Sequence, residues 1–270
     1  MKVSLIITTY NWKEALRVSL RSALCQKRLP DEILIGDDGS RPDTKEMIEI
    51  IAADSAVPIR HVWHEDDGFR LSMIRNKAIA AARCEYLIFI DGDILLHPLF
   101  VDDHLSMAEK GRFFIGRRVL AGQALSQKIL QGKNGFPSLL TMNLHHRKNT
   151  LRIPFITNFC KQQPLPSGKG CGSNMAFWKK DAINVNGFDE DFTGWGREDN
   201  DFTLRLTNAG ICGSFLKFIA LTTHLYHKKN SREHLGKNDE LFAKTAQSGK
   251  IRCEKGVDQY LPELQSVTAV

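Results

Sequence analysis

Long apolar runs are absent from this chain of 270 residues. No segment approaches the roughly 18 consecutive apolar residues of a membrane-spanning helix, so no transmembrane helix is expected. The apolar run within residues 1–10 is too short for a signal peptide and lacks a small-residue cleavage site. The six cysteines are scattered without a C-x-x-C pair, which disfavours disulfides and structural zinc and predicts reduced thiols in a cytoplasmic protein.

Several catalytic signatures are missing as well. No G-x-G-x-x-G follows the first apolar run, which argues against a dinucleotide-dependent oxidoreductase, and no G-x-x-x-x-G-K-[ST] is present. Ser167-Gly168-Lys169-Gly170 resembles the latter only superficially. The chain also has no H-E-x-x-H and no G-x-S-x-G, the signatures of zinc proteases and serine hydrolases.

Acidic residues are absent between Lys110 and Lys180, a stretch that holds thirteen lysines and arginines. The whole chain has a net charge of +6, so the remaining residues together are net negative. A basic band beside an acidic body predicts a polyanionic partner or surface, without identifying which.

The first hundred residues alternate between two periodicities. Apolar runs without polar alternation predict strands covered on both faces, at residues 2–8, 33–36, 59–63 and 86–90. Helical periodicity predicts helices at about residues 12–26, 42–51 and 72–82, the first two capped by Asn11 and Ser40. The fold class predicted is therefore α/β, a doubly wound, mostly parallel sheet with helices on both faces. A smaller, irregular half follows from about residue 98, and a polar tail from residue 228.

Ligands of such sheets bind beyond the carboxyl ends of the strands. Carboxylates stand there after several strands, and their mutual repulsion predicts a positive group that neutralises them. Asp91-Gly92-Asp93 follows a buried strand, and its two carboxylates can both reach Mg²⁺ or Mn²⁺, whose shell substrate phosphates usually complete. A nucleotide diphosphate is the natural substrate for this arrangement. Asp38 can accept a hydrogen bond from a nucleobase imide or a ribose hydroxyl; alternatively, Asp37-Asp38-Gly39-Ser40 is only a strand-to-helix turn.

Residues 187–202 gather six acids, four aromatic residues and three glycines around a predicted helix start. Trp195 offers a flat apolar surface for a sugar ring. Glu198 and Asp199 can supply a general base; alternatively, the acids only favour the helix N-terminus. Further along, His224 and His227 are three residues apart, and one of them is a candidate nitrogen ligand for the expected cation, although a structural role is equally compatible.

The order of these motifs resembles the inverting glycosyltransferases of family 2, which have the GT-A fold. The resemblance covers about residues 1–240. It rests on residues 3–11, Asp37-Asp38-Gly39-Ser40, Arg75-Asn76, Asp91-Gly92-Asp93, Gly172-Ser173-Asn174-Met175, Gly187-Phe188-Asp189-Glu190 and Gly194-Trp195-Gly196-Arg197-Glu198-Asp199. The later motifs resemble the subgroup of chondroitin polymerase modules and animal β-galactosyltransferases.

The resemblance implies a role for each matching residue. Asp38 is expected to bind the uracil imide, and Asp91 the ribose or metal-bound waters. Asp93 is expected to ligate Mn²⁺ or Mg²⁺ directly, and His227 matches the family's late histidine ligand better than His224 does. The full set of predicted donor-binding residues is Thr8, Tyr10, Asp38, Arg75, Asp91 and Trp195, and the predicted metal ligands are Asp93, Asp91 and His227.

The implied reaction moves a sugar from a UDP-sugar to a hydroxyl of a glycan or lipid-linked acceptor, as in bacterial lipopolysaccharide or capsule synthesis. Asp199 is expected to be the catalytic base and Glu198 to orient the acceptor, and a single displacement gives a β-linkage. Residues 1–97 would form the nucleotide-sugar half of one GT-A domain, residues 98–227 the acceptor and catalytic half, and residues 228–270 the tail.

Two other functions fit parts of the sequence. A nucleotidyltransferase or sugar-nucleotide pyrophosphorylase uses a similar sheet and cation, but it would usually show a glycine-rich basic loop after strand one, where this chain has Tyr10-Asn11-Trp12-Lys13-Glu14. A non-enzymatic polyanion-binding protein would suit the isoelectric point near 9.0. Acidic strand ends would repel a phosphate backbone, so no nucleic-acid partner is expected.

The basic band also predicts salt-sensitive peripheral contact with the anionic inner face of the cytoplasmic membrane. The expected contact residues are Arg117, Arg118, His145, His146, Arg147, Lys148 and Arg152, with Leu144, Leu151, Ile153, Phe155 and Ile156 adding apolar contact. The alternatives are a solvated basic surface and binding of the acceptor's own phosphates.

Overall fold

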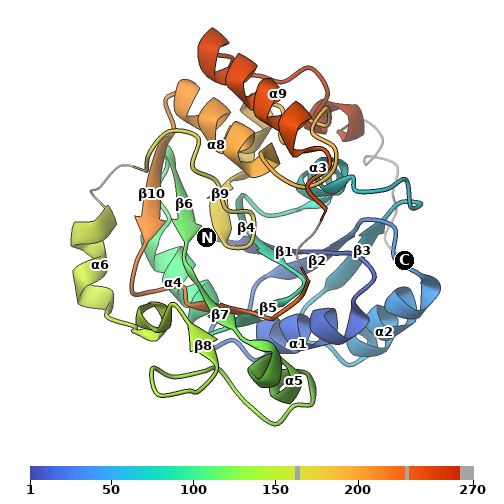
Figure 1. Cartoon of the computed structure of the whole chain (residues 1–270), viewed down its shortest axis with the longest axis vertical. Helices are drawn as coiled ribbons and strands as arrows, with labels where there is room; N and C mark the ends of the chain where they lie inside the picture. Colours follow the sequence, from blue (N-terminus) through green and yellow to red (C-terminus); the bar gives the residue numbers. More distant parts are fainter. Residues whose placement is uncertain (162–164, 229–230, 262–270) are drawn as a thin grey trace.

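The computed structural model describes residues 1–161, 165–228 and 231–261. Its centre is a seven-stranded sheet in the order β10-β6-β9-β4-β1-β2-β3 (Figure 1). Its strands are β1 (Val3–Thr9), β2 (Glu32–Asp37), β3 (Ile59–Trp63), β4 (Tyr86–Asp91), β6 (Arg112–Gly116), β9 (Met175–Trp178) and β10 (Cys212–Leu216). Neighbouring strands are parallel except β9, which runs antiparallel to β4 and β6. The predicted doubly wound, mostly parallel α/β fold is thus confirmed.

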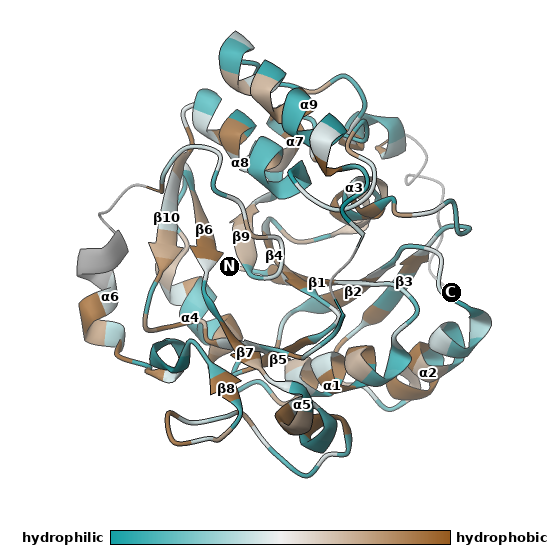
Figure 2. Cartoon of the chain, viewed as in Figure 1, coloured by the Kyte–Doolittle hydropathy of each residue, from teal (hydrophilic) through white to brown (hydrophobic). Residues whose placement is uncertain are grey.

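Helices cover both faces of this sheet because its strands are apolar on both sides. Along β1, Val3, Leu5 and Ile7 enter one core, and Ile6 enters the other. The first core takes α1 (Lys13–Leu24), α2 (Pro42–Ala53) and α4 (Phe100–Met107); the second takes α3 (Leu71–Ala81), α7 (Lys179–Asn184) and α8 (Glu198–Asn208). Figure 2 shows the hydrophobic residues concentrated on the central strands.

The predicted helix caps were wrong. Helix α1 begins after Trp12 and α2 after Arg41, and neither has a side-chain cap. Asn11 instead adopts a left-handed backbone with φ of 47°. Its amide donates to the Ser40 hydroxyl, and its side-chain oxygen accepts from the Arg41 amide, at 2.8 and 3.0 Å. The two predicted caps therefore join the β1–α1 and β2–α2 loops to each other, a contact that sequence spacing does not reveal.

A second, four-stranded sheet forms much of the irregular half, in the order β5-β11-β7-β8. Its strands are β5 (Ile94–Leu96), β11 (Thr222–His224), β7 (Arg118–Ala121) and β8 (Leu144–His145), and α5 (Gln123–Leu130) packs beside it. The remaining elements are η1 (Arg147–Thr150), α6 (Pro154–Lys161), α9 (Leu235–Ser248) and η2 (Val257–Tyr260). Because β5 directly follows Asp93 and pairs with β11, this sheet brings the end of β4 next to His224.

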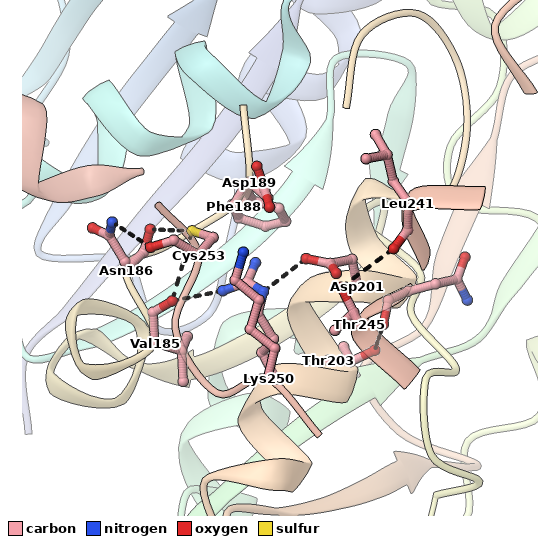
Figure 3. Close-up of polar contacts among 12 residues, drawn as sticks. Val185, Asn186, Phe188, Asp189, Asp201, Thr203, Leu241, Thr245, Lys250 and Cys253 are labelled. Atoms are coloured by element: carbon pink, nitrogen blue, oxygen red, sulfur yellow. Dashed lines mark hydrogen bonds and ion pairs between the residues drawn. The ribbon is translucent and has the colours of Figure 1, made fainter. Parts of the chain in front are cut away.

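The segment expected to be a polar tail packs on the domain. Helix α9 lies against α8 in Figure 1, and the buried Asn238 amide donates to the carbonyls of Thr193 and Gly196. Val257 is fully buried in the core beside α3. Figure 3 shows the Cys253 thiol beside Asn186, whose carbonyl lies 3.2 Å from the sulfur. Residues 229–230 and 262–270 lie outside the described part, so the predicted boundary at 227 stays a prediction.

Candidate active site

A cavity of about 1690 Å³ opens where β1, β2 and β4 end, and the loops after α6, before α8 and after β11 complete its wall. Every predicted site residue lines it: Thr8, Tyr10, Asp38, Arg75, Asp91, Asp93, Trp195, Glu198, Asp199 and His227. The fold thus gathers residues that are more than two hundred positions apart in the chain. The role of each residue stays a prediction.

Asp38, at the end of β2, is buried and held at both carboxylate oxygens. His64 Nε2 lies 2.8 Å from Oδ1, and the Arg70 amide donates to Oδ2 at 2.9 Å. Burial raises the pKa of Asp38, while the hydrogen bond from His64 opposes that rise. The carboxylate therefore has a fixed orientation toward the cavity. Sequence reasoning missed both partners, because β3 and the loop after it carry no motif.

Arg75 is buried at 2% side-chain exposure and stands between two carboxylates. Its guanidinium lies 3.6 Å from Asp91 Oδ1 and 3.2 Å from Glu198 Oε1. Gly172 makes the space for it, since a Cβ there would lie 2.1 Å from the guanidinium. Asp91 also accepts from the Thr8 hydroxyl at 3.2 Å. Arg75 thus links the end of β4 to the start of α8.

Asp93, His224 and His227 form a compact set of candidate metal ligands. One ligand atom from each lies within 4.8 Å of the others, and the two histidine Nε2 atoms are 3.3 and 3.4 Å from Asp93 Oδ2. Sequence reasoning favoured His227 over His224; the structure brings both to Asp93. Asp91, the other predicted ligand, is not part of this set and instead contacts Thr8 and Arg75.

The electrostatics of this set fit a divalent cation. Asp93 Oδ1 is buried and has no hydrogen-bond partner among the described residues. Burial, reinforced by Asp91, raises the pKa of Asp93 to about 8. Burial, reinforced by the Arg118 charge, lowers the pKa of His224 to about 4, which keeps its nitrogen lone pair free for a ligand. A carboxylate with two imidazoles suits Mn²⁺ and other divalent transition metals.

Helix α8 presents the two candidate catalytic carboxylates at its first turn. Arg197, just before it, takes a left-handed backbone with φ of 78°, so the chain turns sharply into the helix. The Asp199 carboxylate accepts the Gly172 amide at 3.0 Å. Glu198 is more deeply buried, and burial together with Asp199 raises its pKa to about 7 despite the nearby Arg75. Both groups reach the cavity, so geometry permits either as a base.

Aromatic side chains form part of the cavity rim. The Tyr10 hydroxyl donates to Asp66 at 2.8 Å, and its ring is half exposed. Trp195 is also exposed, and the Arg232 guanidinium lies over its ring at 5.4 Å. Flat rings on an open rim suit stacking against a base or a sugar.

Arg118 is a cavity residue whose location sequence reasoning misjudged. It belongs to the basic band and was expected on a membrane-facing surface, but it lines the cavity and donates to the Ser173 hydroxyl at 2.7 Å. Its place on β7 beside β11 could not be read from a local pattern.

Other parts of the basic band also differ from the expected surface. Arg152 makes two contacts with the buried Asp103 carboxylate, at 2.5 and 3.1 Å, so its charge is paired within the domain. Leu144 is buried, and Ile153 and Ile156 are half-buried. These residues are therefore poor candidates for contact with a membrane.

Comparison with known proteins identifies the family. Residues 4–171 match the model described as Glycosyl transferase family 2. The chain belongs to glycosyltransferase family 2. A further match, described as N-terminal domain of galactosyltransferase, covers residues 156–228 of this glycosyltransferase. The predicted enzyme class is thereby confirmed, and the nucleotidyltransferase and polyanion-binding alternatives are set aside.

Similar proteins include polysaccharide synthases. The chain is 30% identical over 233 residues to chondroitin synthase of Escherichia coli, covering 77% of this chain and 32% of that protein. It is 30% identical over 234 residues to hyaluronan synthase of Pasteurella multocida, covering 80% and 24%. Validoxylamine A glucosyltransferase of Streptomyces hygroscopicus subsp. limoneus is 27% identical over 234 residues, covering 77% and 48%. The glycosyltransferase thus spans about a third or less of the synthases it matches.

Solved structures confirm the GT-A fold. S. aureus TarS 1–349 in complex with UDP superposes with a TM-score of 0.62 at 18% identity, covering 98% of this chain and 71% of that chain. Within the described residues, every helix is too short or too polar to cross a bilayer.

Proposed function

We propose that this glycosyltransferase moves a sugar from a UDP-sugar to a hydroxyl group of a glycan or lipid-linked acceptor, with a divalent cation and with inversion to a β-linkage. The observation that supports it best is the meeting, in one cavity, of a partly buried carboxylate and two histidines with a carboxylate pair at the start of α8. The carboxylate and histidines would hold the cation that assists departure of the diphosphate. The carboxylate pair would remove the proton from the acceptor hydroxyl.

The donor end of the cavity suits a uridine diphosphate. Asp38, oriented by His64 and the Arg70 amide, would accept the imide hydrogen of uracil. Asp93, His224 and His227 would hold Mn²⁺ or Mg²⁺, which supplies positive charge for the departing diphosphate. Arg118, whose charge acts on both Asp93 and His224, offers a fixed cation on the same side.

The acceptor end holds the base. Asp199 takes the proton of the acceptor hydroxyl as the acceptor oxygen bonds to the anomeric carbon and the bond from that carbon to the UDP oxygen breaks. One displacement of this kind inverts the anomeric configuration. Glu198 already pairs with Arg75, so it positions the acceptor rather than taking its proton. Trp195 offers its ring to the acceptor sugar.

Relatives that make polysaccharides favour a glycan acceptor, in a capsule, lipopolysaccharide or similar polymer. A lipid-linked form of such an acceptor would place the reaction at the inner face of the cytoplasmic membrane, with the enzyme in the cytoplasm.

A panel of nucleotide sugars tests the proposal. With Mn²⁺, one UDP-sugar should be turned over with release of UDP, and excess chelator should stop the reaction. Release of UMP, or of UTP when pyrophosphate is supplied, would indicate a nucleotidyltransferase instead. The anomeric proton coupling of the transfer product should report a β-linkage; an α-linkage, or undiminished turnover in chelator, would contradict the mechanism.

A further inference from the structure

A tight turn between α5 and β8 exposes a group of large apolar side chains. The Thr141 amide donates to the Ser138 carbonyl at 3.1 Å, and the Ser138 amide to the Thr141 hydroxyl at 2.9 Å. Leu139 and Leu140 occupy the two central positions, where turns normally have glycine, proline, asparagine or aspartate. Leu140 is 86% exposed, and Met142 just after the turn is 82% exposed. Two adjacent leucines at such positions indicate a contact outside the chain.

The turn is anchored to the domain at its base. Pro137, immediately before it, is buried, and the Phe136 and His97 rings make a T-shaped contact with their centroids 5.1 Å apart. After the turn, the Asn143 carbonyl accepts the Gly122 amide at 2.8 Å. In Figure 1 the loop from α5 to β8 lies at the lower edge of the molecule, away from α8 and α9.

The chain on either side of the turn carries positive charge and no acidic residue. Lys133, Arg147 and Lys148 are exposed, and no carboxylate among the described residues pairs with them. No acidic residue occurs anywhere between Lys110 and Lys180. A cavity of about 480 Å³ between α1 and the start of this loop adds Arg17 and Arg21, which likewise lack an ion pair within the described ranges.

We infer that this turn docks the enzyme on an anionic lipid bilayer, with Leu139 and Leu140 in the interfacial layer and the neighbouring cations on the headgroups. An anionic bilayer matches both features, because apolar side chains gain by leaving water and each cation near the surface gains about 1 kcal/mol. A soluble polyanionic glycan would engage the cations alone and would leave the leucines in water.

The same segment reaches the catalytic cavity. Asn143 and His145, directly after the turn, line that cavity together with Gly122 and Gln123. Docking through the turn would therefore hold one wall of the cavity close to the bilayer. If the proposed function is right, this places the site within reach of a lipid-linked acceptor at the membrane surface.

Vesicle binding tests the inference without relying on catalysis. Sedimentation would use vesicles of phosphatidylcholine alone and of phosphatidylcholine with 30% phosphatidylglycerol, with the full chain and no substrate. The wild type should bind the anionic vesicles at low salt and be released near 0.5 M salt. Leu139→Ser/Leu140→Ser should bind roughly tenfold or more weakly. Removal of two cations in Arg147→Ala/Lys148→Ala should weaken partitioning by about thirtyfold.

Matched controls separate this surface from general effects. Ile50→Ser removes an apolar side chain that is 71% exposed on α2, and Lys45→Ala/Lys244→Ala removes two exposed cations from α2 and α9. Both should bind like the wild type, and all variants should melt at the wild-type temperature.

Equal binding to neutral and anionic vesicles, or unchanged binding of the leucine variant, would overturn the inference. So would salt-sensitive binding to a soluble anionic polysaccharide with none to vesicles. Loss of transferase activity alone would bear on the proposed function and not on docking.

Discussion

Asp38 and Asp93 follow two strands of the same sheet, and the pKa of each carboxyl is raised by loss of solvent around it. Their surroundings differ. Asp38 has a protein partner at each oxygen, from His64 and from the Arg70 amide. Asp93 has one oxygen with no partner among the described residues, and the Nε2 atoms of two histidines lie 3.3 and 3.4 Å from its other oxygen. The first region is complete within the protein, whereas the second is where we propose that a cation binds.

This difference bears on how each region acts. A carboxylate held by fixed donors recognises a ligand by shape and hydrogen bonding, and it needs no further component. A carboxylate beside two imidazoles, with Asp91 nearby, gains most from a divalent cation. Donor recognition and leaving-group stabilisation should therefore be separable by mutation.

The largest effect should come from Asp93→Ala. Loss of a direct ligand weakens binding of both cation and diphosphate, so turnover should be abolished and UDP should no longer raise the melting temperature in Mn²⁺. Asp38→Ala is the matched comparison: it should weaken UDP binding while leaving Mn²⁺ binding, measured by calorimetry, unchanged. Full activity of Asp93→Ala would refute the metal site, and loss of Mn²⁺ binding in Asp38→Ala would erase the difference between the regions.

A slightly smaller effect is expected at the catalytic pair. Asp199→Asn keeps the shape of the side chain but cannot take a proton, so kcat should fall by about 10²–10⁴ while donor affinity changes little. Glu198→Gln should chiefly raise the acceptor KM. Steady-state kinetics decide between them: a larger kcat loss in Glu198→Gln would make Glu198, whose pKa is raised to about 7, the base.

Acid should also lower the free energy of unfolding, through one buried histidine. His104 on α4 is fully buried against Asn174, just before β9, and burial lowers its pKa to about 4. The unfolded chain binds this proton near its ordinary pKa of about 6.5, so stability is complete above that pH and lost as pH falls toward 4. The expected loss at pH 4 is about 3 kcal/mol of unfolding free energy.

Urea denaturation at several pH values measures this loss. His104→Gln can still donate a hydrogen bond but does not titrate, so its stability should vary less with pH than that of the wild type. Identical pH profiles for both proteins would show that His104 is not the titrating group.

The smallest effect should come from removing His64, which contacts the Asp38 carboxylate. His64→Ala removes one hydrogen bond to the buried carboxylate, worth about 1–2 kcal/mol, so UDP should bind roughly tenfold more weakly. His61→Ala is a close control, because His61 makes the same kind of contact at 2.9 Å to Asp37, which does not line the cavity. Equal losses of UDP affinity in the two variants would show that the effect is general loosening of β3.

The predicted strands and the acidic motifs at their ends could be found from sequence because both are local patterns. Four apolar runs gave β1, β2, β3 and β4 to within about two residues, and the motif order led to the correct family. The prediction of the helix caps was wrong because Asn11 and Ser40 form hydrogen bonds between their two loops rather than with their own helices. The predicted location of Arg118 was wrong because the position of β7 depends on its pairing with β11, a hundred residues later in the chain.

The sequence by itself determined the strand–helix alternation, the carboxylates at the strand ends and the acidic start of α8, since each depends on neighbours within a few residues. Only the tertiary structure decided that both His224 and His227 meet Asp93, that Arg75 lies between Asp91 and Glu198, and that the polar final segment buries Val257. Apart from that of Arg75 with Asp91, these contacts join residues separated by more than one hundred positions, and they form because the second sheet and α9 must cover apolar surfaces that the first half leaves open. Burial against distant partners, rather than any local spacing, therefore fixed the geometry of the cavity.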